Sequence, residues 1–190
     1  MKEYIEDVKK AVEVMRAGGI ILYPTDTIWG IGCDASNSAA VRRIFELKRR
    51  SDSKSMLSLI DSDAKLGYYV PDIPDVAYDL MDLAEKPLTI IYDNVRHMAP
   101  ELIAEDGSAG IRVTKEEFSR ELCRRMGGAV VSTSANISGQ PSPANFSEIS
   151  DEIRKGVDYI VEYRQAELTR SVASGIIKLG SGGLVKVIRE

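Results

Sequence analysis

Residues 18–27 read GGIILYPTDT, and they decide the fold class because a helix end, a strand and a polar loop follow one another directly. Gly18 and Gly19 are typical of the residues that end a helix, and the segment before them has apolar residues at helical spacing. These residues are Ile5, Val8, Val12 and Met15. Residues 20–23 predict a buried strand, and residues 24–27 predict a loop that leaves it. A helix followed by a buried strand indicates an α/β protein.

The alternation continues along the chain. Asn37 and Ser38 predict an N-cap, and Thr114 with Glu117 predicts a capping box for a helix that ends at Gly127. The expected helices cover residues 39–48, 75–84, 114–126 and 146–155. The expected strands cover 56–60, 88–92, 110–113, 129–132, 157–161, 174–179 and 184–188, with a hairpin turn at 181–183. The late strands lie close together in the sequence, so we expect one α/β domain over residues 1–190 with a mixed sheet.

The composition limits the function classes. The 190 residues are 44% apolar with a formal net charge of -4, whereas a protein that coats nucleic acid is usually basic. Cys33 and Cys123 are expected to be reduced thiols, and His97 is the single histidine. A zinc site or a histidine-dependent triad is therefore not expected. The charged amino terminus does not resemble a signal peptide, and no apolar run approaches the roughly 20 residues of a membrane span, so we expect a cytoplasmic protein.

Positive charge is concentrated between residues 42 and 54. The cluster consists of Arg42, Arg43, Lys48, Arg49, Arg50 and Lys54. Such a run is usually a solvated helix face, and cations at a helix C-terminus also interact favourably with the helix dipole. The alternative is a phosphate site, because Lys48 and Arg50 are two residues apart in a segment that leaves the helix and could both face one cleft.

Two polar loops at predicted strand ends are further candidate sites. Residues 132–139 read STSANISG, residue types that build ordinary turns but can also bind phosphate and ribose oxygens. Residues 23–30 form the second loop, and loops at strand ends are where α/β proteins place ligands. The sequence contains no G-x-x-x-x-G-K-[ST], which excludes a Walker-type loop as the means of binding a nucleotide.

Four segments together resemble the YrdC family of threonylcarbamoyl-AMP synthases. They are YPTDTIWGIGCDA at 23–35, Lys48-x-Arg50 followed by Lys54, GIRV at 110–113 and STSANISGQPSP at 132–143, in the order of the family. The resemblance covers nearly the whole chain. It implies a single YrdC-like domain, in which a twisted mixed β-sheet is flanked by helices and carries a concave, positively charged cleft.

The resemblance also implies a reaction. Threonine takes up bicarbonate to give a carbamate, a carbamate oxygen attacks the α-phosphate of ATP, and pyrophosphate leaves. Mg²⁺ is expected to bridge the phosphates, and catalysis would depend on positioning and positive charge rather than on a histidine base. The implied partners are a downstream tRNA-modifying enzyme complex and, through weak contacts, tRNA or double-stranded RNA, with no membrane.

The same resemblance assigns residues to roles. Lys48 and Arg50 are the expected catalytic residues. The residues expected to bind ATP are Arg50, Lys54, Ser108, Ser134, Asn136, Ser142 and Arg189. The residues expected to bind threonine are Thr27, Arg112, Ser132 and Ser174, with the fork of Arg112 on the carboxylate. No protein ligand to a metal is expected.

The chain departs from the family pattern at several positions. Trp29 replaces a usual Tyr, residues 84–89 lack the usual Trp-Pro-Gly-Pro, no proline follows Arg50, and ASGIIKL at 173–179 replaces Ser-Thr-Ile-Val-Asp-Leu. The intact Ser-Ala-Asn at 134–136 favours the synthase branch. Two alternatives stay open: an RNA-binding module that uses the cationic cluster, and a ligase or hydrolase that acts on another carbamoyl- or acyl-adenylate.

Overall fold

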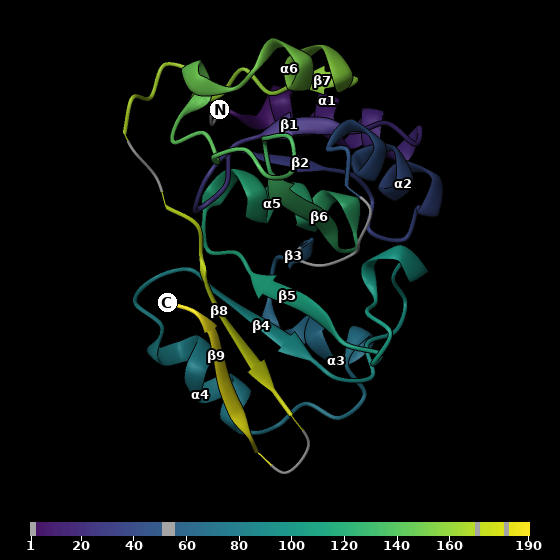
Figure 1. The fold of residues 1–190 in the computed structure, drawn as a ribbon, viewed down its shortest axis with the longest axis vertical. Helices are drawn as coiled ribbons and strands as arrows, with labels where there is room; N and C mark the ends of the chain where they lie inside the picture. Colours follow the sequence, from purple (N-terminus) through teal and green to yellow (C-terminus); the bar gives the residue numbers. More distant parts are fainter. Residues whose placement is uncertain (1–2, 51–55, 170–171, 181–182) are drawn as a thin grey trace.

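The structure is a computed structural model that describes residues 3–50, 56–169, 172–180 and 183–190. Within these ranges, nine strands form one sheet in the order β7-β1-β2-β6-β3-β5-β4-β8-β9 (Figure 1). The strands are β1 (Ile21–Tyr23), β2 (Gly30–Gly32), β3 (Leu57–Ile60), β4 (Leu88–Tyr92), β5 (Ala109–Val113), β6 (Val130–Ser134), β7 (Tyr159–Ile160), β8 (Gly175–Leu179) and β9 (Val185–Arg189). The α-helices are α1 (Ile5–Arg16), α2 (Ser38–Leu47), α3 (Leu66–Tyr69), α4 (Val76–Leu83), α5 (Glu117–Met126) and α6 (Asp151–Gly156). Short 3₁₀ turns are η1 (Asp63–Lys65), η2 (Pro100–Leu102) and η3 (Phe146–Glu148).

The sheet is mixed, which confirms the expected fold class. The pairs β1–β7, β3–β5 and β4–β8 are parallel, whereas β1–β2, β2–β6, β3–β6, β4–β5 and β8–β9 are antiparallel. Figure 1 shows α1, α2 and α6 beside β1 and β2 at one end of the molecule, and α4 beside the β8–β9 hairpin at the other. Strand β6 pairs with both β2 and β3 and so joins the two ends.

The helices pack on the sheet through apolar faces. The buried residues of α1 are Val8, Ala11, Val12 and Met15, at the spacing that the sequence predicts. A Val or Met side chain contributes about 1.5–3 kcal/mol when it is fully buried, and the single methyl group of Ala11 contributes less. Strands β1 and β2 are buried at every residue. Among the described residues, no helix is both long and apolar enough to cross a bilayer.

A close contact between β1, β2 and β6 fixes the point where the loop at residues 24–29 begins. The Tyr23 side chain is fully buried, and its hydroxyl donates to the Val131 carbonyl at 3.0 Å. Gly32 makes room for the ring, because a Cβ there would lie 2.5 Å from the Val131 oxygen and 2.6 Å from Tyr23 Cε1. Glycine is therefore required at this position for steric reasons.

The predicted capping box is wrong. Helix α5 begins at Glu117, and the side chain of Glu116 caps it by accepting hydrogen bonds from the Phe118 and Ser119 amides. Thr114 instead shares a hydrogen bond of 2.7 Å with the Ser119 hydroxyl. A carboxylate at this position has the same effect as the predicted hydroxyl, because both accept from the free amides of the first turn.

Two other predictions differ from the structure. The expected helix over 146–155 is divided into η3 and α6, because Ser150 is extended and caps a new helix by accepting from the Ile153 amide. Strand β2 was not expected, since two of its three residues are glycines. The hairpin turn predicted at 181–183 lies mostly outside the described residues, although β8 and β9 pair as an antiparallel hairpin.

Candidate ligand-binding site

Several predicted site residues lie along one region of the sheet. On β5, Gly110 and Arg112 point to the same side because strand side chains alternate. Gly110 is opposite Leu57 of β3, and Leu57 is opposite Ser132 of β6. A pocket of about 340 Å³ opens beside them, with walls that are mostly apolar. Its lining consists of Met56, Leu57, Thr89, Ile91, Leu102, Ala104, Ser108, Ala109, Gly110, Ile176 and Ile188.

Arg112 is the buried cation of this region. Its side chain is 2% exposed, and its Nη2 lies 2.8 Å from Asp26 Oδ1 and 3.4 Å from the Thr27 hydroxyl. Arg112 Nε is buried without a hydrogen-bond partner. Burial raises the pKa of Asp26 although Arg112 opposes the shift. A guanidinium that is held at one corner with an unused N–H can bind a carboxylate.

The Thr27 hydroxyl is held in place by its own loop. Thr25 Oγ1 lies 3.0 Å from Thr27 Oγ1, accepts from the Thr27 amide at 3.0 Å and donates to the Ile28 carbonyl at 2.8 Å. These local bonds fold residues 25–28 into a tight turn, as side-chain hydroxyls in polar loops commonly do. The turn presents Asp26 and Thr27 to Arg112.

Ser174 and Arg189 form a second part of the region. The Ser174 hydroxyl lies 2.9 Å from Thr89 Oγ1, and the Arg189 guanidinium donates to the Ser174 carbonyl at 2.8 Å. Burial and the neighbouring charge of Arg112 lower the pKa of Arg189. Ser174 therefore contacts both Arg189 and Thr89, and Thr89 was not singled out from the sequence.

Lys48 holds the loop at residues 134–138. It is 1% exposed, and its ammonium donates to the Ser134 and Asn136 carbonyls at 2.5 and 2.6 Å. The Ser138 amide in turn donates to the Lys48 carbonyl at 2.9 Å. Burial, together with the nearby charge of Arg50, lowers the pKa of Lys48 to about 8. The sequence interpretation was that Lys48 and Arg50 could both face one cleft, whereas in the structure the Lys48 ammonium donates to two backbone carbonyls.

The other predicted nucleotide contacts are less closely grouped. Ser108 borders the 340 Å³ pocket and donates to Asp106 at 2.6 Å, with Lys178 at 3.4 Å from its hydroxyl. The Asn136 amide donates within its own loop, to the Ile137 and Gln140 carbonyls. Ser142 is exposed. Arg50 directly follows Arg49, which has a positive φ of 52°, and Lys54 lies outside the described residues.

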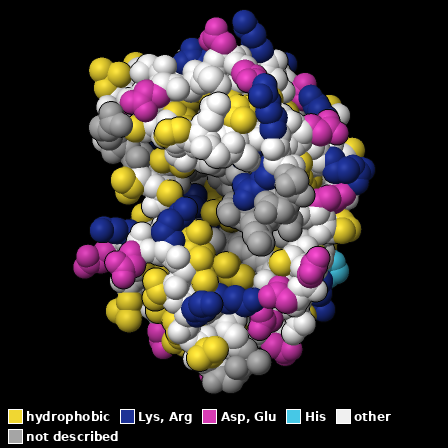
Figure 2. Space-filling model, viewed as in Figure 1, with side chains coloured by type: hydrophobic (Ala, Val, Ile, Leu, Met, Phe, Trp, Pro, Cys, Tyr) yellow, Lys and Arg dark blue, Asp and Glu magenta, His cyan; other side chains and the backbone are white. Residues whose placement is uncertain are grey.

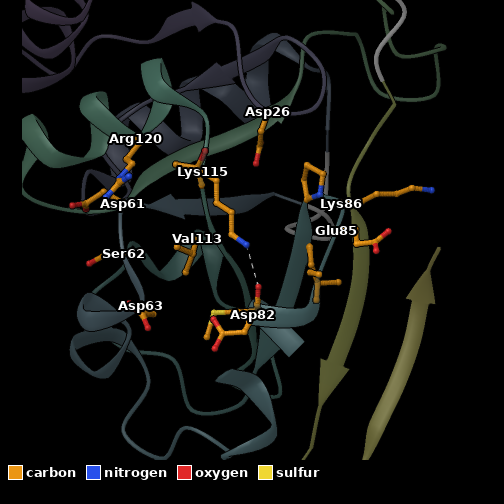
Figure 3. Close-up of a pocket in the computed structure, with 15 residues that line it drawn as sticks. Asp26, Asp61, Ser62, Asp63, Asp82, Glu85, Lys86, Val113, Lys115 and Arg120 are labelled. Carbon is orange, nitrogen blue, oxygen red and sulfur yellow. Dashed lines mark hydrogen bonds between the residues drawn. The ribbon is translucent and has the colours of Figure 1, made fainter. Parts of the chain in front are cut away.

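A second pocket, of about 460 Å³, opens at the ends of β3 and β5, and Asp26 is part of its lining (Figure 3). Its walls combine acidic residues with Lys86, Lys115 and Arg120, and Lys115 donates to the Met81 carbonyl at 3.3 Å. Figure 3 shows Asp26 pointing into it from the loop above. Asp26 therefore both pairs with Arg112 and lines this pocket, a role that the sequence interpretation missed although it quoted this residue.

Figure 2 shows Lys and Arg side chains at several places across the middle of the face seen in Figure 1, interspersed with hydrophobic side chains. The concave, positively charged cleft as one continuous feature stays a prediction. Within the described part of the chain, no group of three or more His, Cys, Asp or Glu side chains could hold a metal ion.

Known proteins with related sequences are threonylcarbamoyl-AMP synthases. The chain is 35% identical to the Stenotrophomonas maltophilia (strain K279a) enzyme over 166 residues, covering 85% of this chain and 88% of that protein. A putative threonylcarbamoyl-AMP synthase of Methanocaldococcus jannaschii is 32% identical over 187 residues, covering 96% of this chain and 86% of that protein.

Solved structures agree with this fold. E. coli YciO superposes with a TM-score of 0.83 at 25% identity, covering 96% of this chain and 88% of that one. P. abyssi Sua5, solved in complex with L-threonine, gives 0.78 at 25% identity over 90% of this chain, which spans about half (50%) of the Sua5 chain. The Sua5/YciO/YrdC family model, described as "Telomere recombination", matches residues 13–190. The chain therefore belongs to the Sua5/YciO/YrdC family.

Proposed function

We propose that this protein is an L-threonylcarbamoyladenylate synthase, which makes threonylcarbamoyl-AMP and pyrophosphate from L-threonine, bicarbonate and ATP. The observation that carries the proposal is the buried guanidinium of Arg112 beside the Thr27 hydroxyl, next to a pocket with apolar walls. Relatives that cover most of the chain carry this name, and a P. abyssi Sua5 of the same fold binds L-threonine.

Threonine is expected in the part of the region that surrounds Arg112. The guanidinium would bind the substrate carboxylate through two parallel N–H groups, including the Nε that has no partner in the structure. Thr27, Ser132 and Ser174 would provide hydroxyls around the small amino acid. Each of them is at least nine-tenths buried, so their positions are defined before the substrate arrives.

ATP is expected next to this subsite. Its base would enter the 340 Å³ pocket with Ser108 at the rim, because apolar walls with a few polar groups suit a heterocycle. Its phosphates would lie toward residues 134–138 and Arg50. Lys48 would act mainly by holding this loop, since its ammonium already binds two carbonyls. Ser134, Asn136, Ser142, Lys54 and Arg189 belong to the same proposal.

The proposed reaction balances without a base from the protein at the adenylation step. The carbamate, formed from the threonine amine and bicarbonate with loss of water, is an anion whose oxygen attacks the α-phosphorus. The bond from that phosphorus to the bridging oxygen breaks, and pyrophosphate leaves with the electron pair. Mg²⁺ would be held by phosphate oxygens and neutralise their charge. The product, a mixed anhydride, would be passed to a tRNA-modifying enzyme complex in the cytoplasm, with weak contacts to tRNA.

An assay of pyrophosphate release tests the proposal directly. Purified protein with ATP, bicarbonate and Mg²⁺ should release pyrophosphate only when L-threonine is added, and serine or valine should give much less. Arg50→Ala should lower turnover by about a hundredfold, because it removes positive charge near the phosphates. Arg49→Ala is the matched control, since Arg49 is 68% exposed and paired with Glu152 at 2.6 Å. Release that is independent of threonine, or an equal loss in both variants, would refute the assignment.

A further inference from the structure

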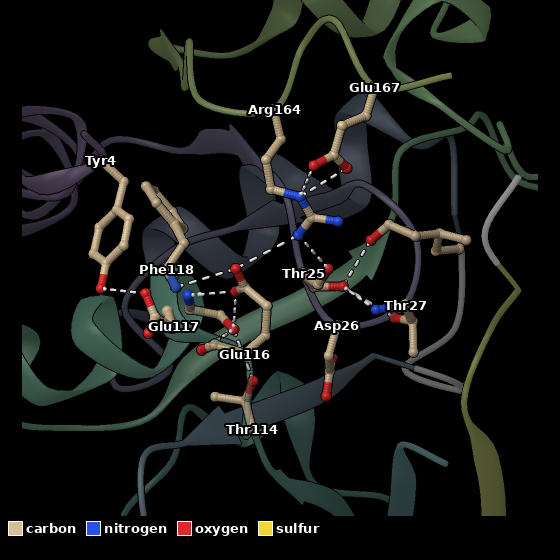
Figure 4. Close-up of polar contacts among 12 residues, drawn as sticks. Tyr4, Thr25, Asp26, Thr27, Thr114, Glu116, Glu117, Phe118, Arg164 and Glu167 are labelled. Atoms are coloured by element: carbon tan, nitrogen blue, oxygen red, sulfur yellow. Dashed lines mark hydrogen bonds and ion pairs between the residues drawn. The ribbon is translucent and has the colours of Figure 1, made fainter. Parts of the chain in front are cut away.

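The segment that follows β7 runs beside the end of β1 and so reaches the loop that carries Thr27. Arg164 extends from this segment, and its Nη1 donates to the Thr25 carbonyl at 3.0 Å. The two residues are far apart in the sequence, so this bond joins separate parts of the chain. Figure 4 shows the Arg164 side chain pointing down toward Thr25, with Asp26 and Thr27 directly beyond it.

The same guanidinium contacts the helix that follows β5. Arg164 Nη1 lies 3.5 Å from Glu116, and Glu116 caps α5 and accepts from the Ser119 hydroxyl at 2.8 Å. Ser119 in turn shares its 2.7 Å hydrogen bond with Thr114, two residues after Arg112. Polar contacts therefore connect Arg164 with the turn that carries Thr27 on one side and with Thr114, just past the end of the strand that carries Arg112, on the other (Figure 4).

Arg164 itself is held firmly. Its Nε donates to both carboxylate oxygens of Glu167, at 2.9 and 2.8 Å, and its side chain is 23% exposed. The preceding residue, Tyr163, donates its amide to Asp7 at 2.7 Å and stacks on Phe118 with ring centroids 5.9 Å apart. The backbone next to Arg164 is thus held in place by helices α1 and α5.

The backbone of Arg164 adopts a conformation that is unfavourable for arginine. Its φ is +67°, in the left-handed region that glycine adopts at far lower cost. A residue with a side chain costs about 1 kcal/mol or more there, so its presence needs a compensating interaction. The contacts with Thr25, Glu116 and Glu167 supply that interaction.

We propose that Arg164 is a positioning residue for the amino-acid substrate, which it does not contact itself. It holds the turn at residues 25–28 so that the Thr27 hydroxyl and Asp26 face Arg112 in one arrangement. The inference rests on the proposed function, because it takes threonine as the ligand of Arg112 and Thr27. It predicts that loss of the Arg164 side chain weakens threonine binding and leaves ATP binding unchanged.

Arg164→Gly is the informative variant. Glycine relieves the positive φ, so the variant should remain folded, while the contacts with the loop are lost. Asn94→Gly is the matched control, since Asn94 has a φ of +54° and lies outside the region described above. Arg164→Gln is the second variant in case glycine destabilises the segment, because it keeps a polar side chain that ends before the Nη position and so cannot make the Thr25 contact.

Calorimetric titration of each variant with L-threonine and with ATP gives the first readout. Arg164→Gly and Arg164→Gln should bind threonine at least about tenfold more weakly, a factor that corresponds to about 1.4 kcal/mol, with ATP affinity within twofold of the wild type. Asn94→Gly should match the wild type for both ligands. Equal weakening for both ligands, or unchanged threonine affinity, would overturn the inference.

Hydrogen exchange without ligand gives a readout that does not depend on the substrate. The amides of residues 25–29 should exchange about tenfold faster in Arg164→Gly and at the wild-type rate in Asn94→Gly. If wild-type protein binds no threonine, the proposed function fails, whereas faster exchange would still support the positioning role. Unchanged exchange in a folded Arg164→Gly variant would remove that role.

Discussion

Replacement of Asp26 by Asn tests whether the Asp26–Arg112 contact is an ion pair in a low-dielectric site. The Asp26 and Arg112 side chains are 12% and 2% exposed, and Asp26 Oδ1 lies 2.8 Å from Arg112 Nη2. Asn has nearly the same shape as Asp, so packing is kept while the negative charge is lost. Arg112 would then stay positively charged in a buried position without the Asp26 carboxylate, its ion-pair partner in the described part of the chain.

The size of the effect follows from this burial. Removal of one partner from a buried ion pair costs about 3–5 kcal/mol, but the same burial raises the pKa of Asp26, so the neutral Asn also recovers the cost of burying a carboxylate charge. We therefore expect a net loss of about 1–3 kcal/mol for Asp26→Asn, which corresponds to a decrease in Tm of about 2–12 °C for a chain of this length. An exposed pair behaves differently. Glu13→Gln removes the Lys10–Glu13 pair, at 3.7 Å with side chains 59% and 70% exposed, and should cost less than about 0.5 kcal/mol.

The assay is urea unfolding at pH 7, followed by far-UV circular dichroism, for wild type and both variants. The slope of free energy against urea should be the same for all three proteins, so that midpoints report stability alone. Burial raises the pKa of Asp26, so just above its usual value the folded state binds more protons than the unfolded state. Wild-type stability therefore falls as pH rises through that window, and Asp26→Asn lacks this contribution. A loss below about 1 kcal/mol for Asp26→Asn would refute the buried ion pair.

Three further predictions concern Lys48 and the packing of β2. Burial lowers the pKa of Lys48 to about 8, so Lys48 loses its positive charge as the pH rises through that value. ATP binding, measured by calorimetry, should therefore weaken between pH 7 and 9.5. Lys48→Met should bind ATP weakly at every pH. The unfolded lysine keeps its proton to a higher pH than the folded one, so the contribution of Lys48 to the free energy of unfolding should rise between about pH 8 and about pH 10.5. Unfolding of wild type and of Lys48→Met, measured across this pH range, would detect the difference. Gly32→Ala places a Cβ 2.5 Å from the Val131 oxygen and should cost about 1–3 kcal/mol in thermal unfolding, whereas Gly67→Ala, with no heavy atom within 4 Å of the added Cβ, should cost far less. An unchanged Tm in Gly32→Ala would show that β1 and β2 are not packed as described.

Local signals in the sequence predicted most helices and strands. The apolar spacing of residues 5–15 and the Asn37 cap both correspond to structure, since the Asn37 side chain accepts from the Ala40 amide at 3.0 Å. Strand β2 was missed because Gly30 and Gly32 have low strand propensity, and its pairing with β1 and β6 compensates for that. The cap of α5 was misassigned because several nearby side chains can accept from the same amides, and only the tertiary contacts select Glu116.

The sequence predicted which residues belong to the site more readily than it predicted the contacts that each of them makes. The resemblance named Arg112 and Thr27, and the structure brings them within 3.4 Å of each other. It did not indicate that Asp26 pairs with Arg112, because a carboxylate in a polar loop is most often solvated. Nor did it indicate that Lys48 is buried and bonded to a backbone loop, since lysines in charged runs are usually exposed.

The sequence by itself determined the α/β class, most element positions and the set of polar loops, because these depend on local periodicity and on residue types that form turns. Only the tertiary structure decided which charges are buried and which groups face one another. Arg164 illustrates the difference, since its Thr25 contact joins parts of the chain that only folding brings together. Burial and long-range contacts arise from the packing of the whole chain, and the interaction between two charges depends on both.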